Sequence, residues 1–281
     1  MAVVPMTQGM WQTYSTRGIW QGLGTPPPPP VTPGWMARAA RRYLRGESFG
    51  VRYWLDASDL QLWLDQSDPR GYGDGANWYD LSGKGNHAAQ AAGGSQPDIA
   101  GTAGLSGACR DFDGADDKMA LGDELDVTTE DFTLIAWVRH DGQPAALEGV
   151  VTKRSTVGYG MYVNTNGRIQ STIQDAGGAI TSTDDGTDLT DNAWHQVAVV
   201  FDRDGNMSRY LDGLIDGSAD GISGANLTIT NADDFVIGDD DSGNSYFWEG
   251  QIACVMMFGK ALNIGEIRQI YMVDKPRYGG L

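Results

Sequence analysis

The chain has 281 residues, of which 41% are hydrophobic and 20% are charged, and this suits one large all-β domain with an extension. A domain of this size buries roughly 70% of the surface of its unfolded chain, so it needs neither a metal nor a disulfide framework to fold. The formal net charge of −17 is uneven: residues 1–52 hold six arginines and one acidic residue, whereas the remainder holds 14 basic and 36 acidic side chains. This acidic body excludes nucleic-acid binding through the large domain, because phosphate contacts require lysine and arginine.

Residues 1–52 are predicted to form an N-terminal arm. A polyproline segment at residues 26–30 predicts a stiff, extended spacer. It is followed by a predicted amphipathic helix over residues 33–45, because Pro33 suits the first helical position and Gly46 is a natural stop. Apolar side chains line one face of this helix and arginines line the other. The arm residues predicted to dock on a partner are Trp11, Trp20, Trp35, Met36, Arg38, Arg41, Arg42, Tyr43 and Arg45.

Three interpretations of the basic helix compete: a membrane-surface helix, a nucleic-acid contact, and a helix packed on protein with its arginines against an acidic surface. The helix is short for a membrane anchor and its neighbour is acidic, so protein docking is favoured, and neither nucleic acid nor membrane is expected as a partner. No stretch approaches the ~20 apolar residues of a transmembrane helix. The first 18 residues also lack the charged and apolar regions of a secretory signal.

From Val51 onward, frequent turn signals predict an all-β region. Asp212-Gly213 lies between apolar residues and predicts a two-residue hairpin turn, because glycine tolerates the positive φ that this turn needs. A helical pattern occurs at residues 264–272, with apolar side chains spaced for one face. The strands are expected at residues 132–139, 159–164, 168–173, 195–202, 208–211, 234–237 and 251–258.

Two of these strands carry apolar residues on both faces, unlike an ordinary half-solvated antiparallel strand. They are residues 132–138 and residues 252–258. We expect their second apolar row to be covered by the arm or by another subunit. The chain has two cysteines, Cys109 and Cys254. A single disulfide between them and two buried free thiols both remain open, and the free thiols are favoured because one pair is not a disulfide framework.

An ordered series of short motifs runs from residue 77 to residue 271. The motifs are NWYDLSGKGNHA (77–88), CRDFDGADD (109–117), FTLIAWV (132–138), WHQVAVVFD (194–202), RYLDG (209–213), NLTI (226–229), FVIGD (235–239), FWEGQIACV (247–255) and ALNIGEIRQIY (261–271). In this order they resemble the laminin-G-like domains, whose fold is an all-β, concanavalin-A-like antiparallel sandwich, or jelly roll. The resemblance implies a sandwich over residues 53–274 after the arm, with a C-terminal tail at residues 275–281. Such folds display binding loops, but fold and ligand are only loosely tied.

The sequence gives no sign of catalysis. Glycoside hydrolysis needs two carboxylates held about 5 to 9 Å apart, and the glutamates of this chain are scattered over predicted loops. The three histidines are isolated, and His195 is expected to be an edge residue that hydrogen-bonds to the backbone. The segment from Trp78 to His87 is interpreted as structural, with Asp80 and Asn86 capping backbone groups. We therefore expect a protein that is not an enzyme.

Acidic loops make calcium the cofactor to consider, because calcium prefers oxygen ligands. The candidate ligands come from two loops, at residues 111–117 and 239–244: Asp113, Asp116, Asp239 and Asp241. A solvated acidic loop is the competing interpretation, and no cofactor is required by the sequence. A glycan site would need an exposed aromatic side chain beside polar groups. The predicted glycan rim is Asp240, Asn244, Tyr246 and Trp248.

Two functions follow as expectations. The first is a structural protein of a virion, in a phage or viral capsid, tail or baseplate, whose arm docks on other virion subunits or on itself and whose sandwich binds a host glycan. The lead-in YWLDASDLQLWLDQSD (53–68) resembles the laminin-G-like proteins of phage structural modules. A fold usually displayed outside cells without an export signal also favours a virion. The alternative is a secreted or cell-surface adhesin that binds carbohydrate, which would place the protein outside the cell.

Overall fold

The computed structural model describes residues 58–90, 92–101, 106–240 and 246–278. The arm, its polyproline segment, its predicted helix and its docking residues lie outside these ranges. So does the predicted boundary between arm and sandwich.

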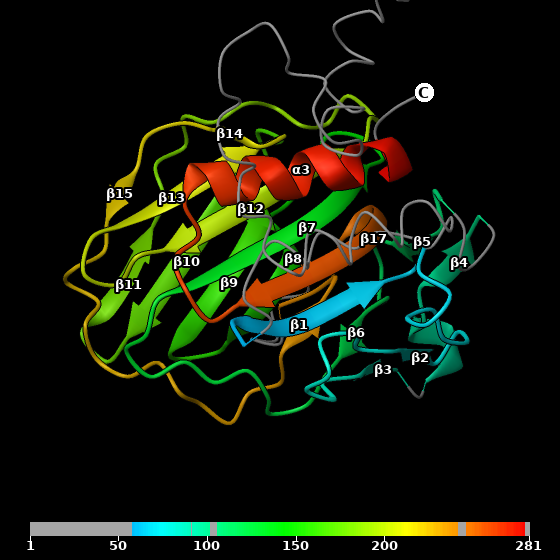
Figure 1. Cartoon of the computed structure of the whole chain (residues 1–281), viewed down its shortest axis with the longest axis horizontal. Helices are drawn as coiled ribbons and strands as arrows, with labels where there is room; N and C mark the ends of the chain where they lie inside the picture. Colours follow the sequence, from blue (N-terminus) through cyan, green and yellow to red (C-terminus); the bar gives the residue numbers. More distant parts are fainter. Residues whose placement is uncertain (1–57, 91, 102–105, 241–245, 279–281) are drawn as a thin grey trace, which may run out of the picture. The chain divides into compact units, whose positions relative to one another are not determined.

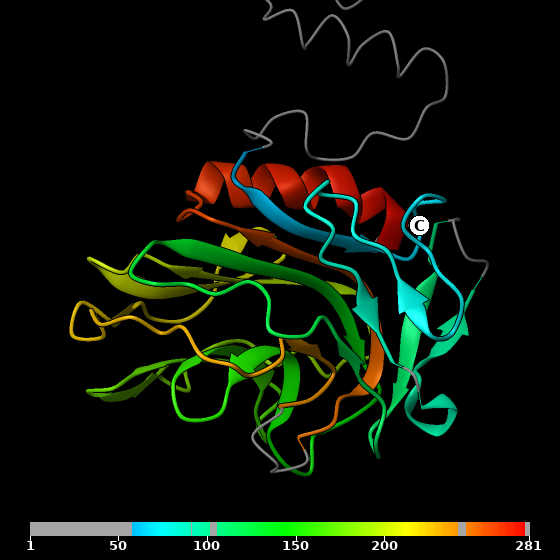
Figure 2. The ribbon, with the colours of Figure 1, turned by 90° about the horizontal axis from the view of Figure 1, so that it is seen from below.

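The described residues form two antiparallel sheets packed face to face (Figures 1 and 2). Sheet A has the order β14 (Leu214–Ile215), β13 (Asn206–Leu211), β12 (His195–Phe201), β7 (Phe132–His140), β17 (Glu249–Phe258), β5 (Cys109–Asp113), β4 (Asp98–Ala100). In addition, β1 (Leu60–Asp65) pairs with β17 and β15 (Asp220–Gly221) pairs with β13. Sheet B has the order β11 (Gly178–Thr181), β10 (Ile169–Asp175), β9 (Gly158–Val163), β8 (Glu148–Arg154), β16 (Val236–Ile237), β6 (Met119–Ala120), β3 (Ala88–Ala89), β2 (Asn77–Trp78). A short 3₁₀ helix, η2 (Gly93–Ser95), and helix α3 (Ile264–Tyr278) complete the elements. The predicted concanavalin-A-like sandwich is confirmed.

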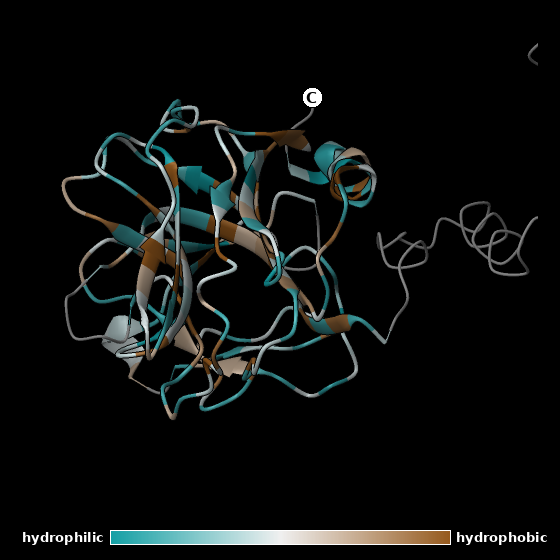
Figure 3. Ribbon diagram, turned by 90° about the vertical axis from the view of Figure 1, so that its left-hand side faces the viewer, coloured by the Kyte–Doolittle hydropathy of each residue, from teal (hydrophilic) through white to brown (hydrophobic). Residues whose placement is uncertain are grey.

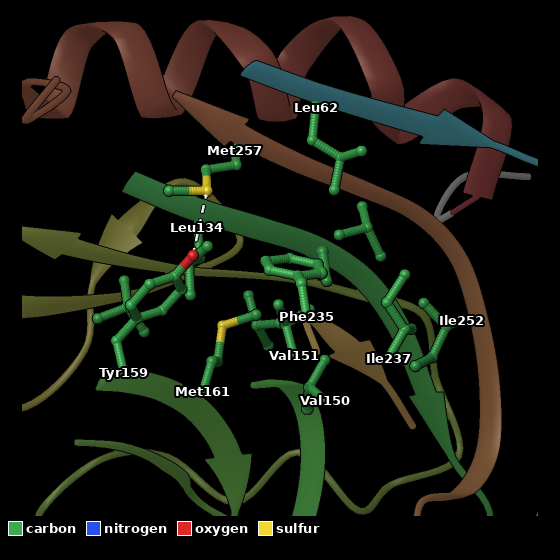
Figure 4. Packing of buried hydrophobic residues seen from close by; sticks show 14 of the residues in the cluster. Leu62, Leu134, Val150, Val151, Tyr159, Met161, Phe235, Ile237, Ile252 and Met257 are labelled. Atoms are coloured by element: carbon green, nitrogen blue, oxygen red, sulfur yellow. Dashed lines mark hydrogen bonds between the residues drawn. The ribbon is translucent and has the colours of Figure 1, made fainter. Parts of the chain in front are cut away.

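The main hydrophobic core lies between the two sheets (Figure 4). It forms because side chains alternate along a strand, so every second residue points inward. On β7 these inward residues include Phe132 and Leu134, and on β9 they include Tyr159 and Met161. The Tyr159 hydroxyl is buried in this core and donates a 2.7 Å hydrogen bond to the carbonyl oxygen of Leu125, which satisfies its polar group.

A second core lies on the outer face of sheet A, under helix α3 and beside β1 (Figure 2). Ile135 and Trp137 of β7 point into it, and Ile267 and Ile270 of α3 close it from outside. The helix is seen nearly end-on in Figure 3, where hydrophobic and hydrophilic stretches alternate around its coil. The second apolar row was expected to be covered by the arm or by another subunit. That expectation is wrong for this face, because α3 of the same chain covers it.

Strand β17 carries a bulge that rearranges its two apolar rows. The pairing with β7 shifts between Ile252 and Cys254. Ile252 therefore shares the inter-sheet core with Val255 and Met257, whereas Cys254 faces α3. Strict alternation would have placed Ile252 and Cys254 on one face. An extra residue in one strand reverses the faces beyond it, which explains the difference.

Helix α3 continues through Tyr278, so the predicted tail at residues 275–281 is wrong for residues 275–278. The last turn of α3 packs on the sandwich because its side chains form hydrogen bonds with β1. Arg277 donates to both carboxylate oxygens of the buried Asp65, at 3.0 and 2.8 Å, and the Tyr278 hydroxyl donates to the same carboxylate at 2.8 Å. This arrangement, the Asp65 latch, ties the end of α3 to the end of β1.

Two local predictions are confirmed. Asp212 and Gly213 have φ angles of 52° and 76° and join β13 to β14 as a two-residue hairpin turn. Asp80 caps backbone groups, because its carboxylate accepts hydrogen bonds from the backbone amides of Trp63, Ser82, Gly85 and Asn86.

Cys109 and Cys254 are both buried free thiols. Burial raises the pKa of Cys109 to about 12. Among the described residues, no helix is long and apolar enough to cross a membrane.

Candidate functional site

The turn that follows β16 points two consecutive carboxylates in different directions. Asp239 is buried and lies 3.4 Å from the ammonium nitrogen of Lys118. Burial raises the pKa of Asp239, although a hydrogen bond from the amide of Asp240 and the charge of Lys118 oppose the rise. Asp240 is also buried, and it accepts a 2.7 Å hydrogen bond from the Tyr162 hydroxyl. Through Asp239 the turn contacts Lys118, which follows the acidic loop at residues 111–117. Through Asp240 it contacts Tyr162 on the outer face of sheet B.

The acidic loop region contains three carboxylates that lie together. One carboxylate oxygen from each of Asp113, Asp116 and Asp117 falls within 4.8 Å of the others, and we call these residues the Asp113 cluster. Asp117 is the buried member. Burial raises its pKa to about 6, and the nearby charges of Asp113 and Asp116 act in the same direction against a hydrogen bond from the Asp113 amide. Carboxylate oxygens grouped in this way suit a hard divalent cation such as calcium.

The predicted calcium ligands do not all lie together in the structure. Asp113 and Asp116 lie in one cluster, as their shared loop suggested, while the carboxylate of Asp239 is turned toward Lys118. Asp241 lies outside the described residues. Asp117 completes the cluster, although it was not among the four chosen ligands. It stands in the same DFDGADD motif, so the sequence did contain its signal.

The predicted glycan rim is wrong for two of its four residues. Trp248 is fully buried and packs edge-on against the His140 ring, with the ring centres 4.9 Å apart. Asp240 is fully buried between Tyr162 and Arg154. Trp248 belongs to the core between the two sheets. Tyr246 is half-buried, and Asn244 lies outside the described residues.

The outer face of sheet B is crossed by a row of eight residues in register, which we call the transverse row. Cross-strand pairing places their Cα atoms opposite one another, so their side chains share one face of the sheet. From one edge to the other, the row reads Asn77, Ala89, Ala120, Val236, Thr152, Gly160, Thr172, Thr181. The neighbours of these residues along the strands, such as Trp78, Met119 and Ile237, point into the inter-sheet core. The row consists of three threonines, two alanines, one glycine, one valine and one asparagine, and the four residues from Val236 to Thr172 are buried.

Polar side chains lie beside this row on the central strands. Arg154 of β8 donates a 3.0 Å hydrogen bond to Gln174 of β10, across Gly158 of β9. The guanidinium of Arg154 also lies 3.7 Å from Asp240. The Tyr162 ring lies over Gly160, where a Cβ atom would come within 2.4 Å of it. Sequence reasoning missed this network, although glycines at alternate positions of GYGMYV were its signal.

The histidines of the chain hold local structure. His195 was expected to bond to the backbone, but its two ring nitrogens lie 3.0 Å from the carboxylates of Asp212 and Asp191. Burial acts to lower the pKa of His195, and hydrogen bonds with these two carboxylates outweigh it and raise the pKa. His140 is buried and lies 2.8 Å from Glu148.

Two antiparallel sheets packed face to face form the β-sandwich of lectin-like proteins. The sequence matches the profile of the concanavalin A-like lectin/glucanases superfamily over residues 113–268, and the chain belongs to that superfamily. A search of curated proteins finds no significant match.

Solved structures with the same fold include the binding domain of paraclostridial mosquitocidal protein 1, with a TM-score of 0.59, 13% identity, and coverage of 76% of this chain and 52% of that one. The botulinum neurotoxin serotype D ligand-binding domain, solved with N-acetylneuraminic acid, has a TM-score of 0.57 and 17% identity, with 77% and 51% coverage. A Trypanosoma rangeli sialidase bound to 2,3-difluorosialic acid has a TM-score of 0.53 and 19% identity, with 76% and 32% coverage. This chain spans about half the length of the two toxin domains. At these identities the likeness concerns the fold alone.

Proposed function

We propose that the chain is a non-catalytic, carbohydrate-binding structural protein of a virion. The observation that carries the carbohydrate part is the outer face of sheet B, where the half-buried Arg154 and Gln174 and the exposed Thr181 present polar groups. Such groups suit sugars, which offer many hydroxyls and small apolar patches to a site with a few placed polar groups. Membership of a superfamily that includes lectins supports the same conclusion.

The absence of catalysis is also a proposal. Within the described strands of sheet B, no outward-facing residue is a carboxylate, and two acids from adjoining turns contact this face: Asp240 at Tyr162 of β9 and Asp74 at Asn77 of β2. A glycosidase needs two carboxylates on either side of one bond, one to donate a proton and one to act as base or nucleophile. Asp240 and Asp74 do not meet this requirement, because β9 and β2 are separated by four other strands of the sheet.

The virion part rests on the composition of the arm. Tryptophans and arginines there suit docking on an acidic protein surface, and the sandwich carries the acidic excess. Mass spectrometry of purified particles from the source tests this part. We expect the polypeptide in the particle at a fixed copy number. Its absence from particles together with its presence on cell surfaces would instead support the adhesin.

Glycan binding is tested with the full-length protein on an array of neutral and sialylated oligosaccharides, with and without added calcium. We expect saturable binding to a subset of the glycans. Calcium-dependent binding would assign the Asp113 cluster a part in recognition, whereas calcium-independent binding would leave that cluster a solvated acidic loop. No binding to any glycan contradicts the carbohydrate proposal.

A further inference from the structure

The edge of sheet B formed by β2 and β3 carries exposed aromatic rings. Tyr79 follows β2 and is 42% exposed. The exposed His87 precedes β3, and the two rings meet edge-on with centres 5.4 Å apart and planes at 90°. Tyr72, which is 40% exposed, is the other exposed aromatic residue in the described part of the chain.

We propose that Tyr79 and His87 form a subsite that stacks an uncharged pyranose ring of the bound glycan. This inference rests on the proposed function and specifies where and how a sugar is held. The apolar face of a pyranose packs on an aromatic ring, and this contact needs an exposed ring with free space beside it.

The transverse row supplies that space. Asn77, Ala89 and Ala120 are paired in register next to the two rings, and each of them is exposed or half-buried. Tyr79 and His87 stand two positions along the strands from Asn77 and Ala89, so their side chains share the same outer face. The alanine side chains are single methyl groups, so they leave space beside the Tyr79 and His87 rings.

The His87 ring and the loop that leads to it are held by hydrogen bonds with Asp80. The amide of Asp80 donates a 3.0 Å hydrogen bond to Nδ1 of His87, so this ring carries its hydrogen on Nε2, where it is available as a donor. The Asp80 carboxylate in turn accepts hydrogen bonds from the amides of Gly85 and Asn86, which fixes the loop that leads to His87. A site ordered before binding loses little conformational entropy when the ligand arrives.

The polar groups around Ala89 and Ala120 define the class of ligand. The Tyr79 hydroxyl both donates and accepts, His87 donates from Nε2, and the side-chain oxygen of Asn77 accepts, since its amide nitrogen is bound to Asp74 at 2.8 Å. None of these groups carries a formal charge in this arrangement. They match sugar hydroxyls rather than a carboxylate, so a neutral sugar is expected and a sialic acid is not.

The experiment compares full-length variants on the glycan array of neutral and sialylated oligosaccharides. Tyr79→Ala and His87→Ala test the subsite, and Met272→Ala is the control because it removes a 60% exposed side chain from α3, which covers sheet A. We expect Tyr79→Ala to weaken binding of the best neutral oligosaccharide about tenfold, and Met272→Ala to leave it within about twofold. Thermal melting shows whether each variant is folded.

A second measurement requires no substitution. Hydroxyl-radical footprinting of the wild-type protein with the best-binding oligosaccharide should protect Tyr79 and His87 and leave the exposed Met272 of α3 reactive. If the wild type binds neutral glycans while Tyr79→Ala binds equally well and Tyr79 stays reactive, the subsite is overturned and the carbohydrate-binding function stands. If only sialylated glycans bind, the neutral-sugar assignment is overturned. If no glycan binds the wild type, both the subsite and the proposed function are overturned.

Discussion

Asp117 is a carboxylate placed where its charge is costly. Burial raises its pKa to about 6, above the value of about 4 for an unfolded chain. The folded state thus holds the proton more tightly than the unfolded state, so the stability contributed by this group falls as pH rises from about 4 to about 6 and stays low above that. We expect Asp117→Asn to melt at a higher temperature than the wild type at pH 7, with the difference disappearing near pH 4.

The matched control for this prediction is Asp204→Asn, which neutralises an exposed aspartate on another loop. Its melting temperature should differ little from that of the wild type at either pH. Excess calcium should raise the melting temperature of the wild type at pH 7 more than that of Asp117→Asn, because a bound cation favours the ionised cluster. A melting difference for Asp117→Asn that is independent of pH would contradict the role of burial.

The roles of single side chains could be predicted from the sequence where they depend on neighbours along the chain. Asp80 caps amides a few residues away, and Asp212 forms a turn with Gly213, so local chemistry was sufficient for both. Trp248 and Asp240 failed as rim residues because their burial depends on partners distant in the sequence, His140 and Tyr162. A sequence motif does not reveal such partners.

Among the elements, helix α3 depends on the Asp65 latch. Asp65 is fully buried, and it binds Arg277 and Tyr278 from the last turn of the helix. Removing one partner leaves a buried charge uncompensated, which typically costs about 3–5 kcal/mol. We expect Arg277→Ala to lower the free energy of unfolding by about 3 kcal/mol, measured by urea denaturation.

Arg168→Ala is the control for the latch, since Arg168 forms an ion pair with Asp184 at 3.4 Å and the two side chains are 36% and 41% exposed. An exposed pair of this kind contributes about 0–1 kcal/mol. Equal losses in the two variants would show that the latch is no stronger than a surface contact. A loss confined to Arg277→Ala supports the assignment of α3 to the folded core.

The strands were easier to predict than the elements that pack on them. The alternation within β7 and the turn after β13 were readable because they depend on spacing alone. The bulge in β17 and the packing of α3 on sheet A were not, because both depend on how separate elements meet. The apolar second row of β17 did indicate that something covers it, without identifying the helix.

For the whole molecule, the two cores and the acidic excess belong to the same part of the chain. Every residue of both hydrophobic clusters lies at Leu60 or later in the described structure. The register of sheet B then brings small side chains from β2 through β11 into one row, which no single motif encodes. The candidate sugar surface is therefore a property of the assembled sheet.

The location of the cores predicts how the protein responds to loss of its arm. A variant lacking residues 1–46 should keep a single cooperative melt, because both clusters remain intact. It should bind the same glycans as the full-length protein, yet fail to enter particles, because the predicted docking residues are gone. Incorporation is measured by mass spectrometry of particles assembled with the variant. A truncated protein that unfolds would place the arm within the core, and one that still enters particles would assign docking to the sandwich.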